Sequence, residues 1–159
     1  MAEIRPVSII FIKFPDIRKA SSGKLHQMAE VSKLATPLVI KYEGLLYQIW
    51  MDDKATNMLI CFGPYPTAHD DNPERSVQLA FEISALLKEN SYENSIGIST
   101  GMAYCGILGN DVLRQHTVIG DVVNQSARIS GVTLKDVICD QATYNATKKS
   151  VEFTFCRTS

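Results

Sequence analysis

The chain has 159 residues, 45% of them apolar, which is enough to bury the core of one domain. Sixteen basic and seventeen acidic side chains leave a formal charge of −1, and this balance argues against binding to nucleic acid or a membrane surface. Four scattered cysteines with apolar neighbours, and no apolar stretch of about 20 residues, predict a cytoplasmic domain with reduced thiols, although the parent protein could be membrane-associated.

The first half of the chain alternates between strand and helix patterns. Residues 7–14 form a β-branched and aromatic run that is typical of a buried strand. Apolar residues at helical spacing predict a helix over 24–42. The short apolar runs 45–50 and 57–62 flank the polar Asp52 and predict a hairpin.

The second half begins with a helix signal. Residues 71–74 (DNPE) provide capping residues, a proline and an early acid, which predict a helix over 73–90. Apolar runs at 95–100 and 103–108 predict a second hairpin that turns at Gly101. The remaining elements that we expect are a helix at 121–129, a strand at 137–139, a helix at 141–148 and a last strand at 152–155.

This order of strand, helix, two strands, helix and strands belongs to the α+β class. We expect a ferredoxin-like α/β sandwich, with an antiparallel-dominated sheet and helices on one face, namely those at 24–42 and 73–90. Residues 1–159 should form a single domain. Such a fold does not by itself indicate a function.

Residues 116–128 (HTVIGDVVNQSAR) hold the polar pattern that is most informative about chemistry. Asn124 and Arg128 are four residues apart on a predicted helix, so they project from the same face. An amide and a guanidinium side by side can hold a sugar and a phosphate, and the donor fork of arginine matches phosphate oxygens. The same spacing is common in polar stripes that only face solvent, so spacing alone leaves both interpretations open.

This segment resembles the motif of class III nucleotidyl cyclases, Tyr-x-x-apolar-Gly-x-x-Val-Asn-x-Ala-Ala/Ser-Arg. The matching positions are Gly120, Val123, Asn124 and Arg128. Upstream, residues 96–101 and 105–109 resemble the Gly-Ile-x-x-Gly and Gly-x-x-Gly blocks of the same family. The likeness covers residues 7 to about 155 and is strongest to the second catalytic half of the soluble, bicarbonate-responsive adenylyl cyclases.

The resemblance implies an active site that forms between two such domains. In the family, the ribose 3′-hydroxyl of a nucleoside triphosphate attacks the α-phosphate, and pyrophosphate and a 3′,5′-cyclic nucleotide are released. Two divalent ions, Mg²⁺ or Mn²⁺, sit on two aspartates. The second half-domain supplies an asparagine that orients the ribose and an arginine that neutralises charge on the α-phosphate, and Asn124 and Arg128 match these catalytic residues.

Two more residues are implied to bind the purine. They are Gln48, which follows Gly44, and Thr117, which precedes the motif glycine. Adenylyl cyclases usually carry lysine at the first position and aspartate or threonine at the second, whereas guanylyl cyclases carry glutamate and cysteine. Thr117 therefore favours ATP, while the amide of Gln48 suits either ATP or GTP. A solvent-facing strand residue is the alternative interpretation of Gln48.

The metal positions depart from the family pattern. If Phe11 is the strand phenylalanine two residues before the first aspartate, Lys13 takes that place, and a protonated lysine cannot bind Mg²⁺. In another register residues 14–17 (FPDI) supply Asp16, but we prefer the first. Asp52 falls near the second metal position and is expected to be a hairpin-turn acid. We therefore expect no metal ligand in this chain, with the ions bound mainly by a partner domain.

The sequence thus predicts the nucleotide-gripping half of an adenylate cyclase, active with a metal-bearing second cyclase homology domain and inactive alone. One alternative is a catalytically inactive pseudo-cyclase domain that regulates a true cyclase partner. Another is a homodimeric or guanylyl cyclase that uses Asp16 and Asp52. The C-terminal hairpin of the family does not occur before Ser159, so we expect a domain cut from a larger protein.

Overall fold

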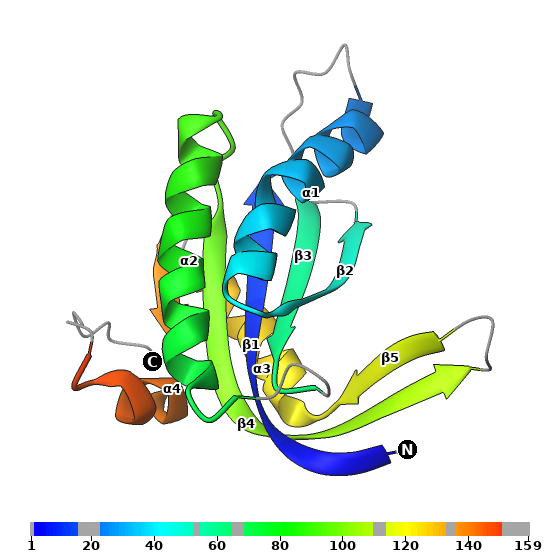
Figure 1. Cartoon of the computed structure of the whole chain (residues 1–159). Helices are drawn as coiled ribbons and strands as arrows, with labels where there is room; N and C mark the ends of the chain where they lie inside the picture. The colour runs from blue at the N-terminus through cyan, green and yellow to red at the C-terminus, as the bar shows by residue number, and fades with distance from the viewer. Residues whose placement is uncertain are drawn as a thin grey trace.

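The computed structural model describes residues 2–15, 23–52, 55–64, 69–109, 114–132 and 136–150 (Figure 1). The strands in these ranges are β1 (Ala2–Pro15), β2 (Leu45–Met51), β3 (Ala55–Phe62), β4 (Ser95–Gly109), β5 (Arg114–Ile119) and β6 (Val137–Cys139). The helices are α1 (Gly23–Lys41), α2 (Asn72–Glu89), α3 (Asp121–Ser130) and α4 (Gln141–Thr147).

The strands form one sheet in the order β2-β3-β1-β4-β5, and β6 pairs with β4. Every pairing is antiparallel except that of β4 with β6, so the predicted antiparallel-dominated sheet is confirmed. Strand β1 lies at the centre, between β3 and β4. Because both of its faces are covered, residues 7–14 are almost continuously apolar.

Helices α1 and α2 cover one face of the sheet, as predicted (Figure 1). Helix α1 buries Val31, Ala35 and Val39 at four-residue spacing. Together with the buried stripe of α2, these residues pack on Ile10 and Ile12 of β1. Burial of each large apolar side chain contributes about 1.5–3 kcal/mol, so this cluster is the main core.

Helix α3 lies against the opposite face of the sheet. Its Val122 joins a second apolar cluster that contains Val7, Ile9 and Phe11 of β1. Successive residues of a strand point to opposite faces, so these three alternate with the residues that contact α1 and α2. The sheet therefore separates α3, which carries two of the predicted site residues, from the two long helices.

One predicted hairpin is wrong. Residues 95–109 form the single strand β4, and Gly101 pairs with Val7 inside the sheet instead of making a turn. The true hairpin partner is β5, which pairs Ile119 with Tyr104. The hairpin at 45–50 and 57–62 and the helices at 24–42, 73–90, 121–129 and 141–148 are confirmed to within one or two residues, and the predicted strand at 152–155 lies outside the described residues.

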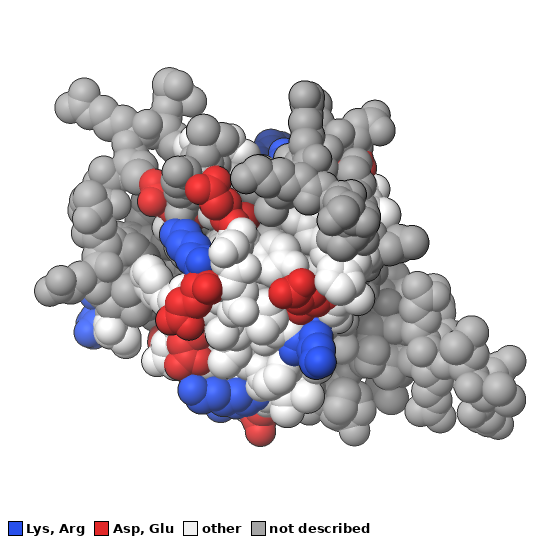
Figure 2. All heavy atoms as spheres, turned by 90° about the horizontal axis from the view of Figure 1, so that it is seen from above, with Lys and Arg blue, Asp and Glu red and all other residues white. Residues whose placement is uncertain are grey.

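The surface shows no strong charge bias in the view from above. On this face, the described basic and acidic side chains interleave (Figure 2). Lys41 of α1 and Glu82 of α2 form an ion pair at 3.1 Å. None of the described helices is long and apolar enough to cross a membrane.

Candidate functional site

Helix α3 carries Asn124 and Arg128 on its outward face. The buried residues of the helix are Val122, Ser126 and Ser130, which recur every fourth residue and face the sheet. Asn124 and Arg128 lie two positions after Val122 and Ser126, on the other side of the helix, and both are exposed. Neither side chain has a hydrogen-bond or ion-pair partner among the described residues, so their donors are available to a ligand.

Small residues of β4 let α3 lie close to the sheet. A β-carbon on Gly97 would lie 2.3 Å from the carbonyl oxygen of Ser126 and 2.5 Å from the backbone nitrogen of Ser130. Two residues on, the buried hydroxyl of Ser99 donates a hydrogen bond to the carbonyl oxygen of Val122. The first glycine of the Gly-Ile-x-x-Gly block is therefore a packing requirement of α3, which sequence reasoning did not identify.

A β-bulge turns Gln48 toward the face that carries α3. The pairing of β2 with β3 shifts between Leu46 and Gln48, so that Gln48 lies opposite Leu59. Directly opposed residues share a face, and Leu59 belongs to the apolar cluster beneath α3. Tyr47, at the bulge, packs against the same cluster. The amide of Gln48 is exposed on that face.

Tyr47 also links the two strands that carry the predicted purine-binding residues. Its hydroxyl accepts a long hydrogen bond, 3.5 Å, from the backbone N–H of Val118. Tyr47 precedes Gln48 and Val118 follows Thr117, so the sequence neighbours of the two residues touch. The half-buried Thr117 alternates with buried Val118, which directs its side chain to the other side of β5. The fold thus brings the strands together without aiming both side chains at one point.

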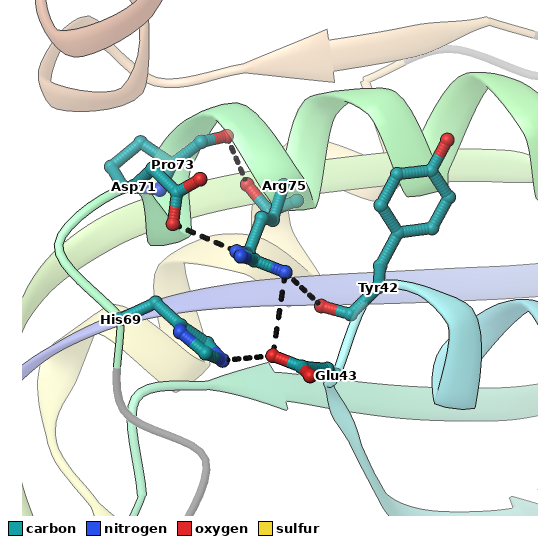
Figure 3. A network of polar contacts seen from close by, with 7 residues as sticks. Tyr42, Glu43, His69, Asp71, Pro73 and Arg75 are labelled. Carbon is teal, nitrogen blue, oxygen red and sulfur yellow. Dashed lines mark hydrogen bonds and ion pairs between the residues drawn. The ribbon is translucent and has the colours of Figure 1, made fainter.

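Ion pairs hold the turn that leads into β2 (Figure 3). Glu43 has a φ of +59°, which costs energy for a residue with a side chain. Its carboxylate pairs with His69 and lies 3.6 Å from the guanidinium of Arg75. Arg75 in turn donates to Asp71 at 2.7 Å and to the carbonyl oxygen of Tyr42 at 3.2 Å. These contacts join the turn to the start of α2 and fix where β2 begins.

The residues at the metal positions that the resemblance implies do not suit divalent metal ions. Lys13 pairs in register with Asn57. Both oxygens of Asp52 already accept hydrogen bonds, from the backbone N–H of Ala55 at 2.8 Å and from the Asn57 amide at 2.9 Å, so Asp52 acts as a turn acid. The described part of the chain contains no group of three or more His, Cys, Asp or Glu that could hold a metal. Asp16 lies outside the described residues.

The described cysteines are free thiols. Burial raises the pKa of Cys61 and of Cys105, and raises that of Cys139 to about 11. Thiols with raised pKa values stay protonated and are poor nucleophiles. Cys61 and Cys105 are buried and unpaired, in line with the apolar neighbours and reduced thiols noted in the sequence.

A hollow of about 460 Å³ opens beside the start of β1 and α2. Its described lining residues are Arg5, Pro6, His69, Asp70 and Asn72. None of the four predicted site residues is among them. Asn124, Arg128 and Gln48 are instead exposed on the face of the sheet that carries α3.

Exposed apolar side chains cross three adjacent strands. Ile4 of β1 lies opposite Tyr104 of β4, which lies opposite Ile119 of β5. They are 68%, 47% and 61% exposed, respectively. Contiguous exposed apolar side chains mark contact surfaces more often than single ones do. We refer to these three residues as the apolar row.

Comparison of the sequence with known proteins gives relatives of one kind, while no family model matches. Human adenylate cyclase type 10 is 30% identical over 158 residues, which is 96% of this chain and 10% of that protein. The enzyme of the same name from Oryctolagus cuniculus is 32% identical over 150 residues, 91% of this chain and 9% of that protein. The chain thus spans about a tenth of the length of these relatives.

Solved structures share the fold at lower identity. The adenylyl cyclase CyaB from P. aeruginosa matches with a TM-score of 0.76 and 18% identity over 96% of this chain and 85% of that one. The guanylyl cyclase Cya2 matches with a TM-score of 0.74 and 23% identity over 91% and 79%. The guanylate cyclase domain of RhGC from Catenaria anguillulae, solved in complex with GTP, gives 0.74 and 18% over 92% and 84%.

Proposed function

Since the chain belongs to the class III adenylyl and guanylyl cyclases as a catalytic domain, we propose that it is the nucleotide-gripping half of an adenylate cyclase. It converts ATP to 3′,5′-cyclic AMP and pyrophosphate in a site shared with a second cyclase homology domain. The observation that carries this proposal is the outward face of α3, on which Asn124 and Arg128 lie exposed and, within the described residues, without partners.

Arg128 stabilises the charge that grows on the α-phosphate. Its guanidinium is permanently ionised and presents a fork of donors that matches two phosphate oxygens. As the 3′-oxygen bonds to the α-phosphorus, the bond from phosphorus to the pyrophosphate oxygen breaks and negative charge increases. A cation held by a packed helix needs no rearrangement to meet that charge, so its effect is greatest in the transition state.

Asn124 acts one helical turn before Arg128. Its amide can hydrogen-bond to the ribose and hold the 3′-hydroxyl in line with the α-phosphorus. Because both residues project from one short helix, the ribose and the phosphate are positioned relative to each other by the same rigid element.

Gln48 contacts the purine in this proposal, whereas the side chain of Thr117 lies on the other side of β5 and does not reach the same point. Gln48 is exposed on the α3 face, and the Tyr47–Val118 hydrogen bond ties its strand to that of Thr117. The amide of Gln48 can donate to N1 of adenine or accept from N1–H of guanine. ATP is therefore preferred over GTP only modestly.

The partner domain supplies the metal ligands in this proposal. Two Mg²⁺ or Mn²⁺ ions shield the triphosphate when bound, and their ligands come from the partner because Lys13 and the engaged carboxylate of Asp52 do not fit them. The apolar row of Ile4, Tyr104 and Ile119 is the surface on which the partner packs.

A complementation assay tests the proposal. The assay needs a second cyclase domain that binds the metal ions but whose own asparagine–arginine pair is disabled. ATP and Mg²⁺ are supplied to this chain alone, to that domain alone and to their mixture. We expect cyclic AMP only from the mixture. Robust cyclic AMP production by the chain alone would contradict the assignment of the metal ligands to the partner domain, and would point to Asp16 as a metal ligand.

A second candidate function is regulation without turnover. Lys13 at a metal position and Gln48 in place of the usual purine reader favour a pseudo-cyclase that changes the activity of a true cyclase partner. In that case the pair binds ATP, the partner's own activity changes on mixing, and substitution of Arg128 leaves the activity of the mixture unaltered.

A further inference from the structure

The rotation of α3 about its own axis is set from its two flanks. On one flank, Val123 and Ala127 pack against the apolar cluster of the sheet. On the other flank, the side-chain amide of Gln125 donates a hydrogen bond to Oδ2 of Asp140, at 3.4 Å. Between these flanks, the outward face carries the two proposed catalytic residues. An apolar contact on one side and a polar contact on the other resist rotation in both directions.

Asp140 is itself firmly held. Its backbone N–H donates to the carbonyl oxygen of Ile98 on β4 at 2.9 Å, and its Oδ2 accepts from the backbone N–H of Thr100 at 3.3 Å. Its Oδ1 accepts from the backbone N–H and the hydroxyl of Thr143 at 2.9 and 2.7 Å, which caps α4. The carboxylate is therefore a fixed point that joins β4, α4 and, through Gln125, α3.

We propose that Gln125 is a positioning residue, which through its hydrogen bond to Asp140 holds Asn124 and Arg128 at the angle that turnover requires. This inference rests on the proposed function. Helix α3 has only ten residues, so loss of one flank contact lets it rotate as a unit. Displacement of catalytic groups by about 1 Å can lower a rate by up to about 100-fold, so a small rotation is enough to be measured.

Substitutions at Gln125 distinguish the effect of its hydrogen-bond donor from the effect of its side-chain size. Gln125→Met keeps the length of the side chain and its helix propensity but removes the donor. Gln125→Lys restores a donor toward Asp140, and Gln125→Glu places a second carboxylate against it. In the complementation assay we expect Gln125→Met to lower kcat by about 3- to 10-fold and to change the KM for ATP by no more than about twofold. Gln125→Glu should lower kcat further. The kcat of Gln125→Lys should stay within about twofold of that of the unsubstituted chain.

A matched control is Gln141→Met. Gln141 also uses its side-chain amide in a hydrogen bond, to Asn145 at 3.0 Å, but both residues lie on α4. This variant should leave kcat unchanged. Equal losses of kcat in Gln125→Met and Gln125→Lys would overturn the inference, because the hydrogen-bond donor would then not be the cause. An unchanged kcat in every Gln125 variant would also overturn it.

Hydrogen–deuterium exchange gives a readout that does not depend on catalysis. In the unmixed chain, amides of residues 123–130 should exchange at least about threefold faster in Gln125→Met than in Gln125→Lys or Gln141→Met. If the unsubstituted chain mixed with its partner domain makes no cyclic AMP, the proposed function fails. Hydrogen–deuterium exchange alone then decides whether the hydrogen bond from Gln125 to Asp140 holds α3. Unchanged exchange in α3 of Gln125→Met would overturn the inference in either case.

Discussion

Gly97 and Ser126 approach so closely that a β-carbon on Gly97 would lie 2.3 Å from the carbonyl oxygen of Ser126. Gly97→Ala must therefore push α3 away from β4. We expect the free energy of unfolding to fall by about 1–3 kcal/mol, as in other overpacked cores, and turnover in the complementation assay to fall further than the loss of folded protein explains. Chemical denaturation and steady-state kinetics measure the two effects.

Gly131→Ala is the control for Gly97→Ala. Gly131 ends the same helix with a φ of −82°, and a β-carbon there would meet the Arg128 carbonyl oxygen at an ordinary 3.5 Å. We expect a change in stability within about 0.5 kcal/mol. Equal effects of the two substitutions would contradict the close packing of α3 on Gly97.

Gln48 should set the choice between ATP and GTP. Gln48→Lys supplies a fixed donor and should raise the ratio of kcat/KM for ATP to that for GTP, whereas Gln48→Glu supplies an acceptor and should lower it. Competition between the two nucleotides in the complementation assay gives the ratio directly. If neither substitution moves it, Gln48 does not read the base.

The fold was largely predictable because its periodic signals are strong. The buried strand at 7–14 and the helical stripe of Val31, Ala35 and Val39 follow from patterns of apolar residues alone. Gly101 misled the prediction because glycine is a turn signal, whereas here it pairs with Val7 in the middle of a sheet. Strand β5 was missed as a hairpin partner since it begins with four polar residues.

The site was predictable only in part. The four-residue spacing of Asn124 and Arg128 does place both on the outward face of α3. The face of Gln48 was not predictable, because it depends on the bulge at Tyr47. The contact between Gln125 and Asp140 joins residues whose spacing carries no local signal, and only the tertiary structure brings them together.

The apolar row should govern association with the partner domain. Tyr104→Lys places a charge in its centre, so we expect the partner concentration for half-maximal turnover to rise about tenfold or more, with thermal stability of the unmixed chain unchanged. Phe81→Lys is the control, since Phe81 is a comparably exposed aromatic residue, 51%, on α2. If the two variants weaken association equally, the row is not the contact surface.

Stability should depend on the pair of Asp71 and Arg75 in a pH-dependent way (Figure 3). The hydrogen bond from Arg75 lowers the pKa of Asp71. A carboxyl group with a lowered pKa in the folded state stabilises above its unfolded value, about 3.9, and loses this contribution as pH falls through the folded value. Asp71→Asn should therefore lower Tm by about 1–3 °C at pH 7 and by nothing measurable near pH 2.

Asp70→Asn is the control for the pH experiment. Asp70 is the neighbouring exposed acid, and it forms no ion pair within the described residues. Its substitution should leave Tm unchanged at both pH values. A Tm difference for Asp71→Asn that stays constant between pH 7 and pH 2 would show that the ionised carboxylate is not responsible.

The kinetics of Arg128 variants test the central claim most directly. In the complementation assay, Arg128→Ala should lower kcat by about 100- to 1,000-fold while the KM for ATP changes far less, because its charge acts chiefly in the transition state. Arg128→Lys should recover little, since one ammonium cannot replace the donor fork. Lys33→Ala, which removes an exposed cation on α1, should leave kcat unchanged. A kcat for Arg128→Ala within about twofold of the unsubstituted chain would contradict the account and make Arg128 an ordinary surface residue.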